Sequence, residues 1–123
     1  MQQRLVANEV EASMHLDHPA FVKLFQLINS DKHFYIIYEY VNGNNLKQTM
    51  TSVGGFTDRQ VFQTIRQVLL GVNALHKAGI CHRDLKTENI VCEKNFKNGA
   101  PVIRICDFGH AMFINKNYKT KNI

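Results

Sequence analysis

Two short segments in the second half of the sequence carry the residues that could do chemistry. The first reads His82-Arg83-Asp84-Leu85-Lys86-Thr87-Glu88-Asn89, and the second reads Asp107-Phe108-Gly109. Phosphoryl transfer requires a carboxylate to orient the attacking hydroxyl, a cation beside the moving phosphoryl group, and oxygen ligands for magnesium. Asp84, Lys86, Asn89 and Asp107 supply this set of groups. The two segments therefore predict a phosphoryl-transfer site that uses Mg2+.

The elements expected around these segments are a long helix and a pair of short strands. Thr57 and Gln60 form a capping box, after which apolar residues recur at helical spacing. Gly79 supplies the C-terminal stop of this helix. Apolar and β-branched residues then predict a strand pair over residues 90–92 and 102–106, joined by a loop over 94–101.

The first half of the sequence predicts a helix, a hairpin and a break. The helix is expected over Leu5–Leu16, and Pro19 prevents it from continuing because the residue before proline avoids helical angles. Apolar and aromatic residues predict two antiparallel strands, over residues 21–27 and 34–41. The polar run Asn42-Gly43-Asn44-Asn45 predicts a break between two subdomains, followed by a short helix over 46–50. This order of elements indicates an α+β protein.

The composition of the 123 residues is that of an ordinary globular protein, with 45% hydrophobic and 20% charged residues. No run approaches the roughly 18 apolar residues of a membrane helix, and the N-terminus lacks the apolar core of a signal peptide. The net charge of +5 is too small to indicate nucleic acid or a membrane as a partner. Cys81, Cys92 and Cys106 are odd in number and lie in apolar runs, which favours reduced thiols in an intracellular, cytoplasmic protein. A zinc site that combines them with His82 or His110 lacks the support of a close Cys-x-x-Cys pair.

The two chemical segments resemble the most specific motifs of the protein kinases. The first matches the catalytic loop H-R-D-x-x-x-x-N and the second matches D-F-G, in the family's order. The resemblance implies that Asp84 orients the substrate hydroxyl, that Lys86 contacts the γ-phosphate of ATP, and that Asn89 and Asp107 bind Mg2+. Lysine at position 86 is typical of kinases that act on serine and threonine of protein substrates. The resemblance also implies that Arg83 pairs with a phosphorylated residue of the activation segment.

The resemblance extends upstream into the first helix. Glu9 falls at the position of the helix C glutamate that pairs with the ATP-binding lysine, and Glu11 is the alternative if the register shifts. Ser13, one turn after Glu9, departs from the large apolar residue that is usual there. His82 and Phe108 would belong to the packed column that links the two lobes of the family's fold.

The resemblance also implies a nucleotide site at the hinge. Tyr38 falls at the gatekeeper position, and backbone groups of Glu39 and Val41 would hydrogen-bond adenine. Asn45 would meet the ribose, and Val91 would form the floor under the base. The implied α+β, kinase-like fold runs from helix C to D-F-G, and its divisions are the end of the N-lobe (1–40), the hinge (41–45) and the start of the C-lobe (46–123).

Parts of the family pattern are not found in this sequence. It has no G-x-G-x-x-G loop, no lysine before Glu9, and no A-P-E motif after Gly109. Kinases need the lysine–glutamate pair, so we expect this partial domain to be inactive by itself and to expose apolar surface. Two other interpretations remain: a naturally short kinase-like module that binds or regulates without catalysis, and a small-molecule kinase of the same fold. The long loop after Glu93 favours the calcium/calmodulin-dependent group of protein kinases.

Overall fold

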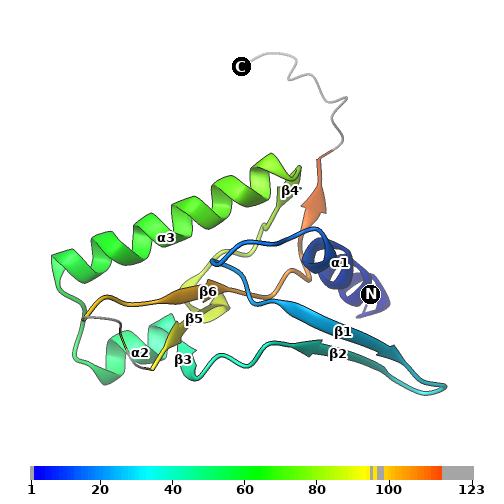
Figure 1. Cartoon of the computed structure of the whole chain (residues 1–123), viewed down its shortest axis with the longest axis horizontal. Helices are drawn as coiled ribbons and strands as arrows, with labels where there is room; N and C mark the ends of the chain where they lie inside the picture. Colours follow the sequence, from blue (N-terminus) through cyan, green and yellow to red (C-terminus); the bar gives the residue numbers. More distant parts are fainter. Residues whose placement is uncertain (1, 95, 97–98, 115–123) are drawn as a thin grey trace, which may run out of the picture.

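The computed structural model describes residues 2–94, 96 and 99–114. Its elements follow the α+β order that the sequence predicts: α1 (Gln2–Met14), β1 (Leu24–Asn29), β2 (Phe34–Tyr38), β3 (Gly43–Asn45), α2 (Leu46–Ser52), α3 (Asp58–Lys77), β4 (Ile80–Cys81), the 3-10 turn η1 (Thr87–Asn89), β5 (Ile90–Glu93), β6 (Ile103–Ile105) and β7 (Met112–Phe113). Figure 1 shows α3 lying along one side of a small sheet, with the β1–β2 hairpin on the opposite side and α1 beside the hairpin.

The best-packed part of the molecule lies between α3 and the strands that carry the chemical segments. Its largest fully buried side chains are Leu75, Ile80, Ile103, Ile105, Pro101 and Cys92. The helix begins as predicted, because the side chains of Thr57 and Gln60 form both hydrogen bonds of the capping box. At Gly71 an added Cβ would lie 2.9 Å from the Cβ of Ala20, so this glycine lets the chain that leads into β1 approach the helix closely.

The central sheet has the strand order β3–β5–β6 and is antiparallel. The predicted pairing of the two strands that flank the loop is confirmed by β5 and β6; residues 95, 97 and 98 of that loop lie outside the described residues. The sequence predicts an irregular break over residues 42–45, but Gly43–Asn45 forms strand β3, so the backbone of this segment is mostly regular; its role as a hinge between subdomains stays a prediction. An added Cβ at Gly43 would lie 1.8 Å from the carbonyl oxygen of Cys92, so glycine here permits a close strand pairing.

The hairpin of β1 and β2 is present and antiparallel, as predicted, but its strands have different bounds. The first strand was expected to begin at Phe21, whereas β1 begins at Leu24. Phe21 is buried and makes an isolated parallel bridge to Ile105, whose amide donates to the Ala20 carbonyl at 2.6 Å. The chain therefore first adds to the edge of β6 and only then enters the hairpin. The second strand ends at Tyr38, three residues before its predicted end at Val41.

Apolar side chains are exposed on two faces, as the sequence analysis expects of a partial domain. One face is the hairpin, with Phe25, Leu27, Ile28, Phe34, Tyr35 and Ile37, and the other is the outer side of α3, with Val61, Phe62, Ile65, Leu69 and Leu70. An unanticipated pairing of β4 with β7 closes the C-terminal end of the described chain. Within the described ranges, none of the helices has the length and apolarity needed to cross a membrane.

Candidate active site

The loop that follows β4 is fixed by the buried imidazole of His82. Its Nδ1 accepts a hydrogen bond from the Asp84 amide at 3.1 Å, so Nε2 carries the ring proton and donates it to the Cys106 carbonyl at 2.9 Å. Arg83 lies between the two residues with a φ of 65°, a left-handed conformation that costs an L-residue about 1–2 kcal/mol. The imidazole thus holds a strained turn and joins it to the residue that precedes the second motif.

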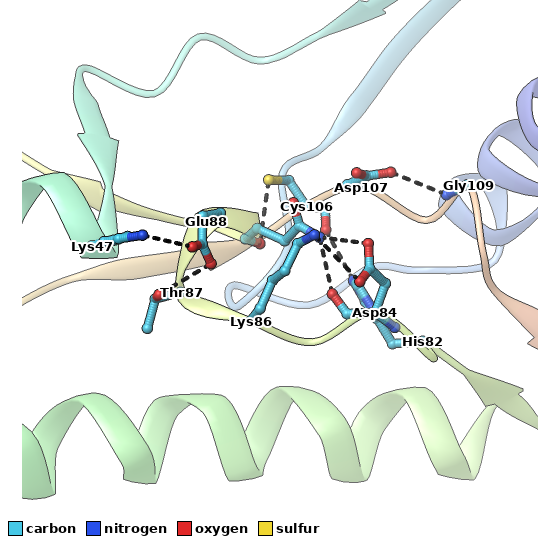
Figure 2. Close-up of polar contacts among 10 residues, drawn as sticks. Lys47, His82, Asp84, Lys86, Thr87, Glu88, Cys106, Asp107 and Gly109 are labelled. Atoms are coloured by element: carbon cyan, nitrogen blue, oxygen red, sulfur yellow. Dashed lines mark hydrogen bonds and ion pairs between the residues drawn. The ribbon is translucent and has the colours of Figure 1, made fainter.

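The amide of Asn89 determines where the carboxylate of Asp84 lies. Nδ2 of Asn89 donates to the Asp84 carbonyl at 2.9 Å and to Asp84 Oδ2 at 3.0 Å. Lys86 lies at the other carboxylate oxygen, with its Nζ 3.5 Å from Oδ1. Figure 2 shows Lys86 and Asp84 beside each other, with Asp107 above them. The structure therefore brings together the carboxylate and the cation that the sequence predicts for the transfer step.

Asp107 is the second residue after the end of β6 and is exposed. Its φ of 61° is again left-handed, and its Oδ1 accepts a hydrogen bond from the Gly109 amide at 3.3 Å (Figure 2). The preceding residue is tied to the catalytic loop, because the Cys106 amide donates to the Asn89 carbonyl at 3.0 Å. The two predicted metal ligands therefore come from segments that a backbone hydrogen bond holds together.

The oxygen atoms of Asn89 and Asp107 fit a magnesium ion. The Nδ2 of Asn89 is committed to Asp84, so its Oδ1 is the atom of the amide that suits a cation. Asp107 has a second carboxylate oxygen besides the one that accepts from Gly109. Mg2+ prefers such hard oxygen ligands and keeps several waters, so one carboxylate and one amide oxygen suffice beside substrate phosphates.

Phe108 joins the two motifs to the first half of the chain. Its side chain is 2% exposed, and its ring centroid lies 5.1 Å from that of His82 and 5.7 Å from that of Phe21. Asn8 of α1 donates from Nδ2 to the Gly109 carbonyl at 3.4 Å. His82 and Phe108 thus pack together, as the family resemblance implies, and α1 contacts the second motif directly.

Glu9 points toward this site, whereas Glu11 points away from it. Oε1 of Glu9 accepts a hydrogen bond from the Tyr38 hydroxyl at 2.9 Å. Burial raises the pKa of the Tyr38 phenol, and the nearby carboxylates of Glu9 and Asp107 raise it further. Glu11 instead lines an apolar groove on the hairpin side of α1, with Leu27 among its neighbours. The geometry favours Glu9 over Glu11 as the residue that faces the chemical groups.

The predicted adenine contacts lie on the segment that follows β2. The Glu39 amide donates to the Lys23 carbonyl at 2.8 Å, and the Glu39 carboxylate accepts from the Lys23 amide at 2.8 Å and lies 3.9 Å from Nε of Arg104. Within the described residues, no hydrogen bond involves the Glu39 carbonyl or the Val41 amide. These two backbone groups are therefore available to hydrogen-bond adenine, and that contact stays a prediction.

The predicted ribose and base-floor residues are opposite each other in the sheet. Asn45 on β3 pairs with Val91 on β5, so both side chains lie on the same face of the sheet, and both residues are half-buried. Oδ1 of Asn45 accepts a hydrogen bond from the Gln48 amide at 2.8 Å and caps α2, which leaves Nδ2 as its donor. The structure thus places these two residues together, and their contact with a nucleotide stays a prediction.

Sequence reasoning missed the contacts that join the site to its surroundings. Nε of Arg83 donates to the His110 carbonyl at 2.8 Å, and the pairing of Arg83 with a phosphorylated residue stays a prediction. The hydroxyl of Tyr38 donates a hydrogen bond to Glu9, whereas the sequence placed Tyr38 at the gatekeeper position without indicating this contact. The available signal was Ser13, a polar residue where the family has a large apolar one, which indicated a polar neighbour across the helix interface.

Comparison with known proteins agrees with this geometry. The sequence matches the protein kinase domain family over residues 1–123. It is 34% identical over 112 residues to the probable serine/threonine-protein kinase fhkD of Dictyostelium discoideum, covering 91% of this chain and 15% of that protein. It is 36% identical over 106 residues to the serine/threonine-protein kinase SRK2J of Arabidopsis thaliana, covering 86% and 30% respectively. For sperm motility kinase 3A of Mus musculus the identity is 38% over 104 residues, covering 85% and 20%.

The chain therefore belongs to the protein kinase domain family, and the relatives it matches are serine/threonine kinases. It spans less than a third of the length of these relatives.

Proposed function

We propose that this chain contributes the catalytic and magnesium-binding loops of a serine/threonine protein kinase, which transfers the γ-phosphate of ATP to a protein hydroxyl. The observation that carries the proposal is the arrangement around Asp84. Its carboxylate is held by Asn89 at 3.0 Å and accompanied by Lys86 at 3.5 Å, beside the segment that presents Asp107. Positioning and charge stabilisation provide nearly all of the catalysis in phosphoryl transfer, and this arrangement supplies both.

The roles follow from the contacts of each side chain. Asp84 is half-buried and fixed, so its carboxylate can orient a serine or threonine hydroxyl and accept its proton as the new O–P bond forms and the bond from the γ-phosphorus to the departing ADP breaks. Lys86 keeps half of its side chain exposed, so its ammonium can reach both Asp84 and a transferred phosphoryl group. Asn89 and Asp107 would hold magnesium, which neutralises phosphate charge when it is bound. Glu39 and Val41 would bind adenine, with Asn45 at the ribose and Val91 under the base.

Glu9 is proposed to complete the nucleotide site by pairing with the lysine that holds the ATP phosphates. Its carboxylate faces the site, in contact with Tyr38. We further propose that the division into N-lobe end, hinge and C-lobe start follows residues 1–40, 41–45 and 46–123, with β3 as a strand within the hinge region. An intracellular location accords with the three free cysteines of the described chain.

The test is transfer of labelled γ-phosphate from ATP to a library of serine and threonine peptides by the protein purified from its source. Asp84→Asn should lower kcat by about 10²–10⁴-fold, because the amide cannot accept the proton. Asp31→Asn is the matched control, since Asp31 is exposed in the turn of the hairpin, away from the site, and should keep full activity. Retention of activity by Asp84→Asn would contradict the proposal. A protein that binds ATP without any transfer would instead support the binding or regulatory module.

A further inference from the structure

Ser13 lies at a position where the family usually has a large apolar residue, and in this structure its hydroxyl has a hydrogen-bonding partner. The serine is 6% exposed, and its hydroxyl lies 3.3 Å from the hydroxyl of Tyr38. The same phenol donates to Oε1 of Glu9 at 2.9 Å. Glu9 and Ser13 are one helical turn apart on α1, so a single hydroxyl from β2 contacts both residues.

We propose that Ser13 and Tyr38 are positioning residues that form a hydrogen-bonded relay, and that this relay orients the Glu9 carboxylate toward the phosphate side of the site. The inference rests on the proposed function, in which Glu9 pairs with the lysine that holds the phosphates of ATP. We call the three hydrogen-bonded side chains Ser13, Tyr38 and Glu9 the α1 relay.

The direction of the α1 relay is fixed by the chemistry of its members. An ionised carboxylate only accepts hydrogen bonds, so the single proton of the Tyr38 hydroxyl goes to Glu9. The Tyr38 oxygen is then the acceptor for the Ser13 hydroxyl. Because burial raises the pKa of Tyr38, the phenol stays protonated in neutral solution and remains a donor to Glu9.

The packing of α1 shows why such a relay is needed. Between α1 and the hairpin lies the open apolar groove, with a volume of about 680 Å³ and a lining that includes Val10, Leu27 and Phe34. On the side of this groove, packing against the hairpin does not fix the rotation of α1, whereas the opposite side of the helix buries Ala12 completely. Glu11 lies on the groove side of α1, so a rotation of α1 that brought Glu11 toward the site would move Glu9 away from it. The relay provides a directional contact that fixes this rotation.

The first part of the test measures steady-state kinetics of the native, full-length protein. Tyr38→Phe removes only the hydroxyl and should raise the KM for ATP and lower kcat/KM about tenfold, which corresponds to loss of one hydrogen bond to a charged group. Ser13→Ala should have a smaller effect in the same direction. Tyr35→Phe is the matched control, because Tyr35 is exposed on the same strand and should leave both parameters unchanged. A merely structural role would reduce the active fraction and leave the KM for ATP as it is.

A second pair of measurements separates positioning from folding. Hydrogen exchange of the α1 amides should become about tenfold faster in Tyr38→Phe and stay unchanged in Tyr35→Phe. The double variant Tyr38→Phe with Ser13→Leu replaces the polar contact by apolar packing, so it should restore slow exchange without restoring the KM for ATP.

The outcomes distinguish failure of the α1 relay from failure of the proposed function. If Glu9→Gln raises the KM for ATP while Tyr38→Phe behaves like Tyr35→Phe, the α1 relay is overturned and the proposed function stands. If Glu9→Gln and Tyr38→Phe both leave the KM for ATP unchanged, the role of Glu9 and the relay are overturned together. Full activity of Asp84→Asn would refute the proposed function itself.

Discussion

The catalytic segment and the β1–β2 hairpin are held in very different ways. In the described residues of the segment 80–111, the site residues lie beside buried strands, and backbone and side-chain hydrogen bonds join the catalytic loop to the segment after β6. In the hairpin, most side chains of both strands are exposed. The polar contact of the hairpin with α1 passes through the hydroxyl of Tyr38.

This difference indicates which site residues are positioned by contacts within their own segment and which depend on another part of the molecule. The positions of Asp84, Asn89 and Asp107 depend on contacts that lie within one well-packed unit based on α3. The position of Glu9 depends on a two-stranded sheet, and such a sheet is only marginally stable without further packing. We therefore expect the catalytic segment to be rigid and the α1–hairpin unit to be the part that adjusts.

Removal of a core side chain should show this contrast most strongly. Leu75→Ala should lower the free energy of unfolding by about 2–5 kcal/mol, because Leu75 is fully buried against the catalytic strands. Leu27→Ala is the matched control in the hairpin, where the side chain is 43% exposed, and should cost less than about 1 kcal/mol. Urea unfolding of the purified variants measures both values. Equal losses would mean that the hairpin is as well packed as the catalytic segment.

A glycine substitution should break the strand pairing that links the hinge region to the catalytic segment. Gly43→Ala would place a Cβ 1.8 Å from the backbone oxygen of Cys92, so β3 must move away from β5. We expect a loss of about 1–3 kcal/mol or more, measured by urea unfolding. Asn44→Ala on the same strand is exposed and should change stability by less than about 0.5 kcal/mol. If Gly43→Ala is as mild as its neighbour, the close pairing of these strands is wrong.

The same contrast decides what could be predicted from the sequence. The start of α3 and the β5–β6 pair depend on local signals, namely a capping box and two apolar runs, and both were predicted correctly. The proximity of Asp84, Lys86 and Asn89 could be predicted because these residues lie within one short segment of the sequence.

The features that were missed depend on contacts between distant segments. Strand β3 exists because Gly43 fits against Cys92, and a polar Asn-Gly run carries no local sign of that partner. Phe21 lies in the core beside β6 instead of in the hairpin, although alternation along the sequence favoured a strand there. The Tyr38–Glu9 contact depends on the rotation of α1, which an imperfect apolar stripe does not specify.

Loss of the N-terminal cap of α3 should lower the stability of the catalytic segment. Thr57→Ala removes the acceptor for the Gln60 amide and leaves that donor of α3 without its side-chain partner. We expect a loss of about 1 kcal/mol, seen as a lower midpoint in thermal or urea unfolding. Thr51→Ala, at an exposed position of α2, is the control and should change the midpoint little. A cap variant as stable as this control would show that packing alone determines where α3 begins.

The smallest effect concerns the pH dependence of stability at Cys106, where the catalytic segment meets α1. Burial, and then the charges of Asp107 and Glu9, raise the pKa of this thiol from 9.0 to about 11. As the pH rises, the thiol of the unfolded chain ionises at a lower pH than the thiol of the folded chain. The stabilisation that comes from the raised pKa of Cys106 is therefore complete below pH 9 and is lost as the pH rises toward about 11. Cys106→Ala should therefore lose less stability than the wild type between pH 8 and pH 10, by on the order of 1 kcal/mol, in urea unfolding at each pH. The burial of Cys92 also raises its pKa, but that thiol is present in both proteins and cancels. Parallel curves for the two proteins would mean that water reaches Cys106, and that the junction between the two regions is as open as the hairpin.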